Sequence, residues 1–114
     1  MLYSPRISDD PLYQLIRNGE IDEFNRRKDL GESCDLTNCD FRNLDLRGID
    51  VSGLDMSGCY FRQADLRGVD FSQTGLEGAS INSARISGAY FPRELSAKEI
   101  DLSMEHGTRM RYRG

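Results

Sequence analysis

The sequence predicts an all-β solenoid, a chain coiled into short stacked strands, with a short helix capping each end. Residues 34–93 divide into twelve units of five residues, and the third residue of every unit is apolar. A second period of twenty residues relates 39–53 to 59–73, where nine of fifteen positions are identical. Internal periods of this kind decide the architecture before any single element is considered.

The five-residue period indicates strands and corners rather than a helix. An α-helix turns by about 100° per residue, so apolar residues five apart would spread around its surface and leave no buried stripe. Within a unit the first and third residues are apolar, with Thr74 the one polar exception at the first position, and the second and fourth are polar. This alternation is typical of a strand with one buried face. The fifth residue should form a corner, which favours the glycines found there: Gly48, Gly53, Gly58, Gly68, Gly78 and Gly88.

The twenty-residue period places like residues on top of one another. Four five-residue sides make one coil, and each coil rises by the spacing of neighbouring strands, about 4.8 Å. Stacking predicts two aromatic pairs, Phe41 over Phe61 and Phe71 over Phe91 on the opposite side. Ring contacts within each pair would add to the burial of the side chains.

The twelve units, from CDLTN through AYFPR, resemble the pentapeptide-repeat family, whose pattern is small-Asp/Asn-Leu/Phe-x-x. The resemblance covers 60 of the 114 residues. It implies a right-handed quadrilateral β-helix of about three coils built from 12 pentapeptides. The last turn departs from the pattern, because its second positions hold Gly75, Ser80, Arg85 and Tyr90 in place of aspartate.

Residues 1–33 are expected to form an N-terminal helical cap on this β-helix, which itself spans residues 34–93 within one structural domain. An extended lead-in precedes Asp10 and Pro11, a capping carboxylate followed by proline at the first helical position. The first helix should end at Asn18, just before a glycine.

A second short helix is predicted over residues 20–28, with Ile21 and Phe24 facing inward. Caps are needed because the open ends of a β-helix would otherwise recruit further strands. Three coils bury few apolar side chains, so this burial barely offsets the conformational entropy lost on folding. Removal of either cap is therefore expected to unfold the stack.

Residues 94–114 are expected to form a C-terminal capping helix and a basic tail. Ser96 with Glu99 three residues later reads as a capping box. The helix should therefore run from Ala97 to about His106, where a glycine ends it.

The apolar side of this helix would cover the last coil or a second copy of the chain. It is formed by Ala97, Ile100 and Met104, and a homodimer through Ile100 and Met104 is one interpretation. The tail that follows is expected to be short and disordered, although its arginines also suit a phosphate or membrane surface: Arg109, Arg111 and Arg113.

Composition narrows the classes of function. The 114 residues form one domain with a net charge of −4 and a pI near 4.9, so general attraction to nucleic acid or an anionic membrane is not expected. No apolar run reaches the ~18 residues of a transmembrane helix. Three cysteines without zinc-ligand spacing favour a reducing cytoplasm over a disulfide framework.

Catalytic and cofactor chemistry find little support in the sequence. There is no Ser-His-Asp set and no phosphate-binding glycine loop, and the single histidine, His106, lies in the final cap. Stacking places Cys39 under Cys59 within disulfide range, but both point inward, so buried inert thiols are expected. We predict a non-enzymatic protein without metal or cofactor.

Outward-facing arginines are the candidate partner-binding residues. Arginines should stack in like-charged pairs on two adjacent sides, and like charges at one strand spacing repel unless something compensates. One interpretation is a solvated lattice in which Asp45 and Asp65 neutralise the arginines. The other is a basic strip that grips an acidic partner or phosphate, formed by Arg42, Arg47, Arg62, Arg67 and Arg85.

The remaining two sides lack arginine until Arg93 and are otherwise acidic, so the predicted solenoid carries opposite charges on its two halves. Many of these carboxylates are also expected to support the fold by accepting backbone N–H groups at the corners. The acidic residues are Asp35, Asp50, Asp55, Asp70 and Glu77.

Three functions follow from these surfaces. The first is a rigid protein–protein interaction module with an unidentified partner, since a preordered surface loses little entropy on binding. The second comes from the family resemblance: longer pentapeptide-repeat proteins mimic DNA and modulate type II topoisomerases, notably DNA gyrase. Three coils with two arginine-bearing sides match that long acidic rod poorly. The third is binding of an anionic ligand or nucleic acid by the arginine strip, which predicts a steep salt dependence.

Overall fold

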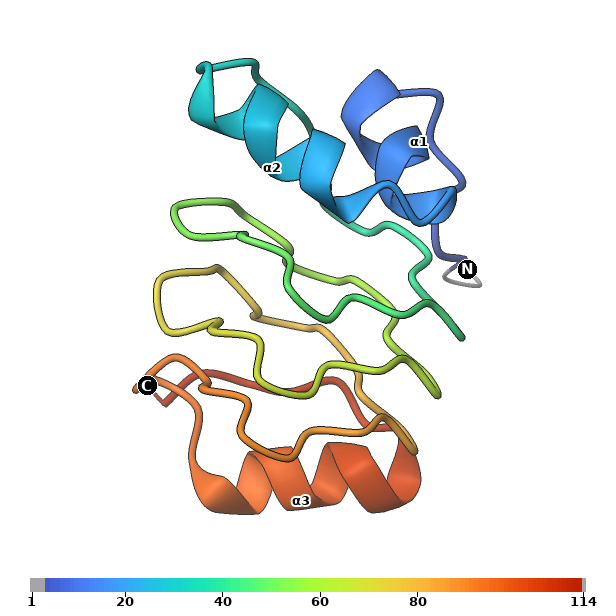
Figure 1. The fold of residues 1–114 in the computed structure, drawn as a ribbon. Coiled ribbons are helices and arrows are strands. Elements are labelled where there is room, and N and C mark those ends of the chain that lie inside the picture. The colour runs from blue at the N-terminus through green and yellow to red at the C-terminus, as the bar shows by residue number, and fades with distance from the viewer. Residues whose placement is uncertain (1–3, 114) are drawn as a thin grey trace.

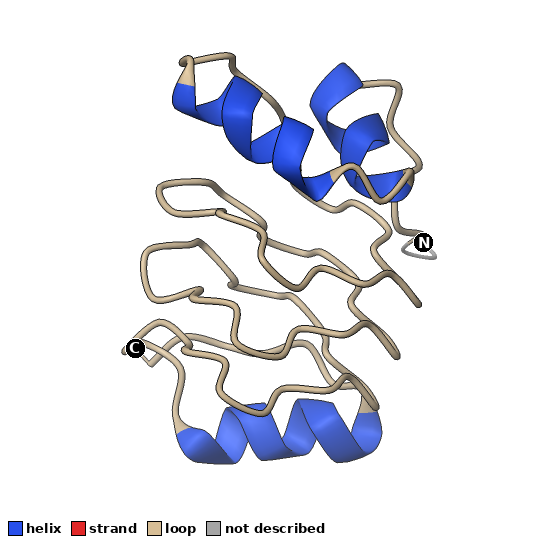
Figure 2. Ribbon diagram, viewed as in Figure 1, coloured by secondary structure: helices blue, strands red, loops and turns tan. Residues whose placement is uncertain are grey.

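The computed structural model describes residues 4–113 and has helices at both ends of a stacked coil (Figure 1). Helices α1 (Pro11–Arg17) and α2 (Ile21–Asp29) lie together at one end, and α3 (Ala97–His106) lies at the other. The chain between them has no extended strand within the described residues (Figure 2).

Backbone hydrogen bonds connect neighbouring coils around bridges between residues that lie twenty apart in the sequence, such as Asp45 and Asp65. The Leu46 N–H donates to the Asp65 carbonyl at 2.9 Å, and the Asp65 N–H donates to the Leu44 carbonyl at 2.9 Å. Parallel bridges with the same offset recur along the chain, and the residues of the third coil that take part in them are Gly75, Ser80, Arg85 and Tyr90. The last coil therefore stacks regularly even though its second positions have lost the aspartate.

The strands predicted for each unit are reduced to single bridged residues. The third residue of a unit and the first residue of the next are joined by a turn, as where the Leu44 N–H donates to the Phe41 carbonyl at 3.3 Å. Because this turn occupies four of every five residues, only the second position is left free to pair as a strand. The prediction of short strands was wrong in length for this reason.

The fifth position adopts the positive φ expected of a corner, with or without glycine. Asn38, Asn43, Gln63 and Ser83 have φ of 57°, 64°, 58° and 58° at this position. Gln73 does not share this conformation, and its own carbonyl accepts the Gly53 N–H at 2.7 Å.

The interior is built from the third residue of each unit. Ten of the twelve are buried, whereas Ile86 and Phe91 of the last coil are half-buried. Both predicted aromatic pairs are confirmed: the rings of Phe41 and Phe61 stack with centroids 5.4 Å apart, and those of Phe71 and Phe91 at 6.0 Å.

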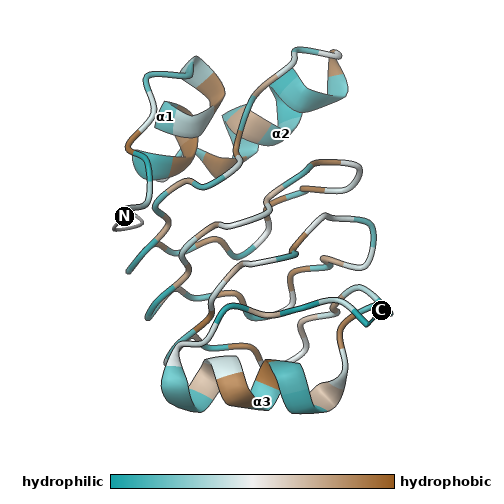
Figure 3. Cartoon of the chain, turned by 180° about the vertical axis from the view of Figure 1, so that it is seen from behind, coloured by the Kyte–Doolittle hydropathy of each residue, from teal (hydrophilic) through white to brown (hydrophobic). Residues whose placement is uncertain are grey.

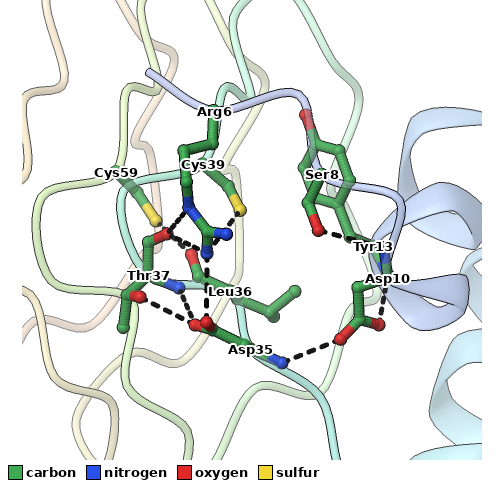
Figure 4. Close-up of polar contacts among 9 residues, drawn as sticks. All are labelled: Arg6, Ser8, Asp10, Tyr13, Asp35, Leu36, Thr37, Cys39 and Cys59. Carbon is green, nitrogen blue, oxygen red and sulfur yellow. Dashed lines mark hydrogen bonds and ion pairs between the residues drawn. The ribbon is translucent and has the colours of Figure 1, made fainter. Parts of the chain in front are cut away.

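The N-terminal cap is attached to the first coil through Asp10 (Figure 4). One carboxylate oxygen caps α1 by accepting the Leu12 N–H at 2.9 Å, and the other accepts the Asp35 N–H at 3.0 Å. The lead-in before it adds a further bridge, in which Arg6 pairs with Cys39 in parallel. The lead-in therefore covers one open edge of the stack; its first three residues lie outside the described part of the chain.

Helix α3 begins at the predicted residue but buries a different face. The Ser96 hydroxyl accepts the Glu99 N–H at 3.2 Å, while the Glu99 carboxylate accepts the Arg111 N–H rather than completing a capping box. Ala97, predicted to face the coil, is exposed, and Ser103 is fully buried. Hydrophilic and hydrophobic residues alternate along α3 (Figure 3), and Ser103 shares the covered face with Ile100 because it lies three residues further on.

The tail after α3 is ordered, so the prediction of a disordered tail was wrong. Met110 is fully buried, and its N–H and carbonyl bond to Ala79 and Gly78 of the last coil at 2.8 and 2.7 Å. The Tyr112 hydroxyl accepts the Leu76 N–H at 2.8 Å. A tail with three alternating arginines can order here because the residues between them, Met110 and Tyr112, face the coil.

Replacing Ser83 with glycine should stabilise the protein. Ser83 is exposed and has positive φ, a conformation that costs a residue with a Cβ about 1–2 kcal/mol. After allowing for the greater flexibility of unfolded glycine, we expect a gain of about 0.5–1 kcal/mol in denaturant unfolding. Ser87→Gly is the matched control: it changes an exposed serine without positive φ and should destabilise by a similar amount. Equal effects of the two substitutions would contradict this account.

Candidate functional site

Bridges and backbone hydrogen bonds between residues about twenty apart group the repeat units into four sets, each called a side here and named after one residue of its middle unit. The Asp55 side comprises residues 35–38, 55–58 and 75–78, and the Arg62 side comprises 40–43, 60–63 and 80–83. The Arg67 side comprises 45–48, 65–68 and 85–88, and the Asp70 side comprises 50–53, 70–73 and 90–93. This grouping follows from the bridges at twenty-residue spacing.

An aspartate at the second position of a unit accepts the backbone N–H of the fourth residue. Asp55, for example, accepts the Ser57 N–H at 2.9 Å and also accepts the Ser57 hydroxyl. The same backbone contact, an Asx turn, occurs at Asp35, Asp40, Asp45, Asp50, Asp65 and Asp70. The expectation that these carboxylates support the corners is therefore confirmed.

Where the fourth residue is arginine, the same carboxylate also holds the guanidinium group. Arg42 donates to both oxygens of Asp40 at 2.9 and 2.7 Å, and Arg67 donates to those of Asp65 at 2.9 and 2.7 Å. Arg47 is held by Asp45 in the same way and also reaches Asp65 of the next coil at 3.4 Å. The arginines of the Arg67 side thus belong to a network of neutralising ion pairs.

Arg62 departs from this rule because Tyr60 occupies the position of the aspartate. Within residues 4–113 the structure gives the Arg62 guanidinium no ion pair, and the side chain is exposed. Arg85, the fifth predicted residue, is also exposed and lies in a bridge over Asp65 without an ion pair. The predicted strip therefore divides into three neutralised arginines and two uncompensated ones.

Two hollows adjoin on the Arg62 side. The larger has a volume of about 450 Å³, and its lining includes Arg17, Arg42 and Arg62. The smaller, of about 210 Å³, shares Arg42 and Arg62 and extends to Asn82 and His106 at the α3 end. Of the five predicted arginines, the structure thus brings Arg42 and Arg62 together at a shared concave surface.

Sequence analysis missed the contribution of the two caps to this surface. Arg17 is the last residue of α1, and the Arg109 guanidinium carbon lies 5.9 Å from the centre of the Tyr60 ring. His106 is the last residue of α3. These side chains lie outside the repeat, so no period in the sequence indicated that they would approach Arg62.

The three cysteines are free thiols, and Cys39 and Cys59 are buried, as predicted. Burial raises the pKa of Cys34 and Cys39 to about 11 and raises the pKa of Cys59 further. The Cys59 thiol donates to the Leu36 carbonyl at 2.8 Å (Figure 4). Among the described residues, no group of three His, Cys, Asp or Glu side chains could hold a metal ion, and no helix is long and apolar enough to cross a membrane.

Replacing Asp65 with asparagine should destabilise the protein at neutral pH but much less in acid. The hydrogen bonds from Arg67, with further help from the charge of Arg47, lower the pKa of Asp65 to about 2. Because the folded pKa lies below the unfolded value of about 3.9, the stabilisation is complete above pH ~4 and is lost as the pH falls through ~2.

The measurement is the free energy of unfolding of wild type and Asp65→Asn as a function of pH. Asp101→Asn makes the same charge change on the exposed surface of α3, where the structure gives the side chain no ion pair. It should differ little from wild type at pH 7. A difference between wild type and Asp65→Asn that does not change with pH would contradict the role assigned to Asp65.

The comparison with known families identifies the repeat. The family model described as pentapeptide repeats (8 copies) matches residues 34–73 and 55–91, which together cover half of the chain. No curated protein and no solved structure matches the chain. Proteins built from these repeats are generally structural or interaction modules. The chain belongs to the pentapeptide-repeat family.

Proposed function

We propose that this protein is a non-enzymatic protein–protein interaction module that presents its charged sides to a partner. The observation that carries the proposal is the fixed arrangement of surface side chains. Asp40, Asp45 and Asp65 each bind both a backbone N–H and a guanidinium group two residues away. Side chains held in this way lose little conformational entropy when a partner binds.

The proposal includes the finer architecture that the family implies, a right-handed quadrilateral β-helix of about three coils. Four bridged positions per twenty residues support the quadrilateral form. A cap at each end would restrict partners to the sides, because the coil edges are covered by the lead-in and by the tail.

Mimicry of DNA at a type II topoisomerase is less well supported. A DNA mimic needs a continuous acidic surface, and here two of the four sides carry several arginines within three coils and a third carries Arg93. A homodimer through α3 would lengthen the rod. Its proposed contacts Ile100 and Met104 are already half-buried against the apolar core of this chain.

We place the module in the cytoplasm as part of the same proposal. Three free cysteines support a reducing compartment, because thiols in an oxidising one tend to form disulfides.

Charge reversal on one side should abolish partner capture while reversal on the others leaves it intact. The variants are Asp55→Lys, Arg62→Glu, Arg85→Glu and Asp70→Lys, one for each side. Circular dichroism first confirms that each still folds. We expect a partner captured from a lysate of the native host to bind at least tenfold more weakly, about 1.4 kcal/mol, to the variant of the contacting side.

Equal capture by all four variants would contradict an interaction through the sides. The partner would then have to contact the caps, and the fixed charges of the sides would serve the fold alone.

A further inference from the structure

Among the arginines at the fourth position of a unit, only Arg62 has no aspartate two residues before it, and it lines a hollow together with Arg17 and Arg42. Arg42, Arg47 and Arg67 each follow an aspartate by two residues and are held by it. Arg62 follows Tyr60 instead, so the carboxylate that would neutralise it is missing from its own unit. A single change in the repeat therefore leaves one guanidinium group available to a ligand.

The neighbours of Arg62 extend the positive surface. Arg17 reaches the same hollow from α1, where it donates to the Asp40 carbonyl at 3.4 Å. The lining of this hollow thus has three guanidinium groups and one carboxylate, that of Asp40, which already binds Arg42. The side-chain amides of Asn43 and Gln63 add neutral donors to the lining.

The shape of this surface is a strip rather than a closed pocket. The two hollows share Arg42 and Arg62 and continue from Arg17 at the α1 end to His106 at the α3 end. The strip is one side wide, and the backbones that carry Arg42 and Arg62 are about one strand spacing, 4.8 Å, apart. An extended peptide rises about 3.3 Å per residue and points successive side chains to opposite faces, so carboxylates two residues apart, about 6.6 Å, lie on one face and can reach successive arginines through their flexible side chains.

The charges around the strip favour a narrow ligand. On one flank the Asp55 side carries Asp35, Asp55 and Glu77, and on the other flank Arg47 and Arg67 are already paired with aspartates, although Arg85, within the described chain, is not. The whole chain has a net charge of −4. A nucleic acid spreads its phosphates over more than one side and would meet these carboxylates. A peptide segment confined to the strip avoids them.

We infer that the Arg62 side, from Arg17 across Arg42 and Arg62 to His106, binds an extended acidic segment of a partner protein. This inference rests on the proposed function and specifies its side and its partner chemistry. Arg62 supplies a charge without an ion-pair partner. Arg17 and Arg42 already contact Asp40 and can bind the acidic segment at the same time.

The test measures binding of a fluorescein-labelled octaglutamate peptide by fluorescence anisotropy at low ionic strength. Wild type should give saturable binding that weakens with added salt. Arg62→Gln should weaken it by about three- to fivefold, the upper part of the range expected for loss of one exposed charge contact. Arg93→Gln is the matched control, because it removes the same charge from an exposed arginine on the opposite, Asp70 side, and it should change affinity by less than about twofold.

A second variant restores the repeat. Tyr60→Asp gives Arg62 the carboxylate that Arg42 and Arg67 already have, so it should weaken peptide binding about as much as Arg62→Gln while leaving the unfolding midpoint close to that of wild type. A role for Tyr60 in stability alone would produce the opposite pattern, with a lowered midpoint and unchanged binding.

Several outcomes would overturn the inference. They are the absence of saturable peptide binding, equal weakening by Arg62→Gln and Arg93→Gln, and tighter binding of an oligonucleotide with the same number of negative charges. These outcomes differ from those that would contradict the proposed function. If charge reversal on another side abolished capture of the partner, the protein would still be an interaction module, with its binding surface on that side.

Discussion

The aspartate at the second position of the repeat is the contact on which the surface of this molecule depends. Its carboxylate accepts the N–H of the fourth residue and so fixes the turn that ends each unit, as at Asp55 and Asp70. A fold that stacks residue n on residue n + 20 also stacks like charges, which is unfavourable at one strand spacing. Aspartates that hold the turn remove this penalty at the same time, because they bind the arginines of their own unit.

The two chain termini solve the second problem of a solenoid, which is its open edges. A short β-helix presents unpaired N–H and carbonyl groups at each end, where further strands can add. Arg6 pairs with Cys39 at one end, and Met110 bonds to Gly78 and Ala79 at the other. Segments outside the repeat thus extend its hydrogen bonding before the helices cover it, and the arginines between them remain at the surface.

The sequence predicted what depends on local rules. The units, the aromatic pairs Phe41 with Phe61 and Phe71 with Phe91, and the start of each terminal helix follow from period, capping residue and glycine, and the structure contains them. It did not predict what depends on segments far apart in the chain. Ser103 was overlooked because a serine on a helix gives no sign of burial, yet its hydroxyl accepts the Ile81 N–H at 2.9 Å and donates to the Thr108 carbonyl at 2.6 Å.

The candidate site was likewise predicted only in the part that belongs to the repeat. Stacking correctly indicated which sides carry arginines, and the expected lattice exists at Arg47 and Arg67. The approach of Arg17 and His106 to Arg62 could not be read from the repeat, because both belong to caps whose orientation is set by tertiary contacts.

Arg62 can be compared with equivalent arginines in the other units of the repeat. In an irregular protein an exposed arginine without a carboxylate partner is ordinary. Here the coil above and the next side each show the compensated version of the same unit, Arg42 with Asp40 and Arg67 with Asp65, in nearly the same geometry. The fold therefore does not require Arg62 to be unpaired, since the same backbone accommodates the ion pair elsewhere. Selection for a stable corner alone would favour aspartate at position 60. In other units the aspartate at this place accepts the backbone N–H of the fourth residue, and tyrosine has no carboxylate to do so. The exposed charge of Arg62 is therefore not needed to form the coil and contributes only to the surface of the protein.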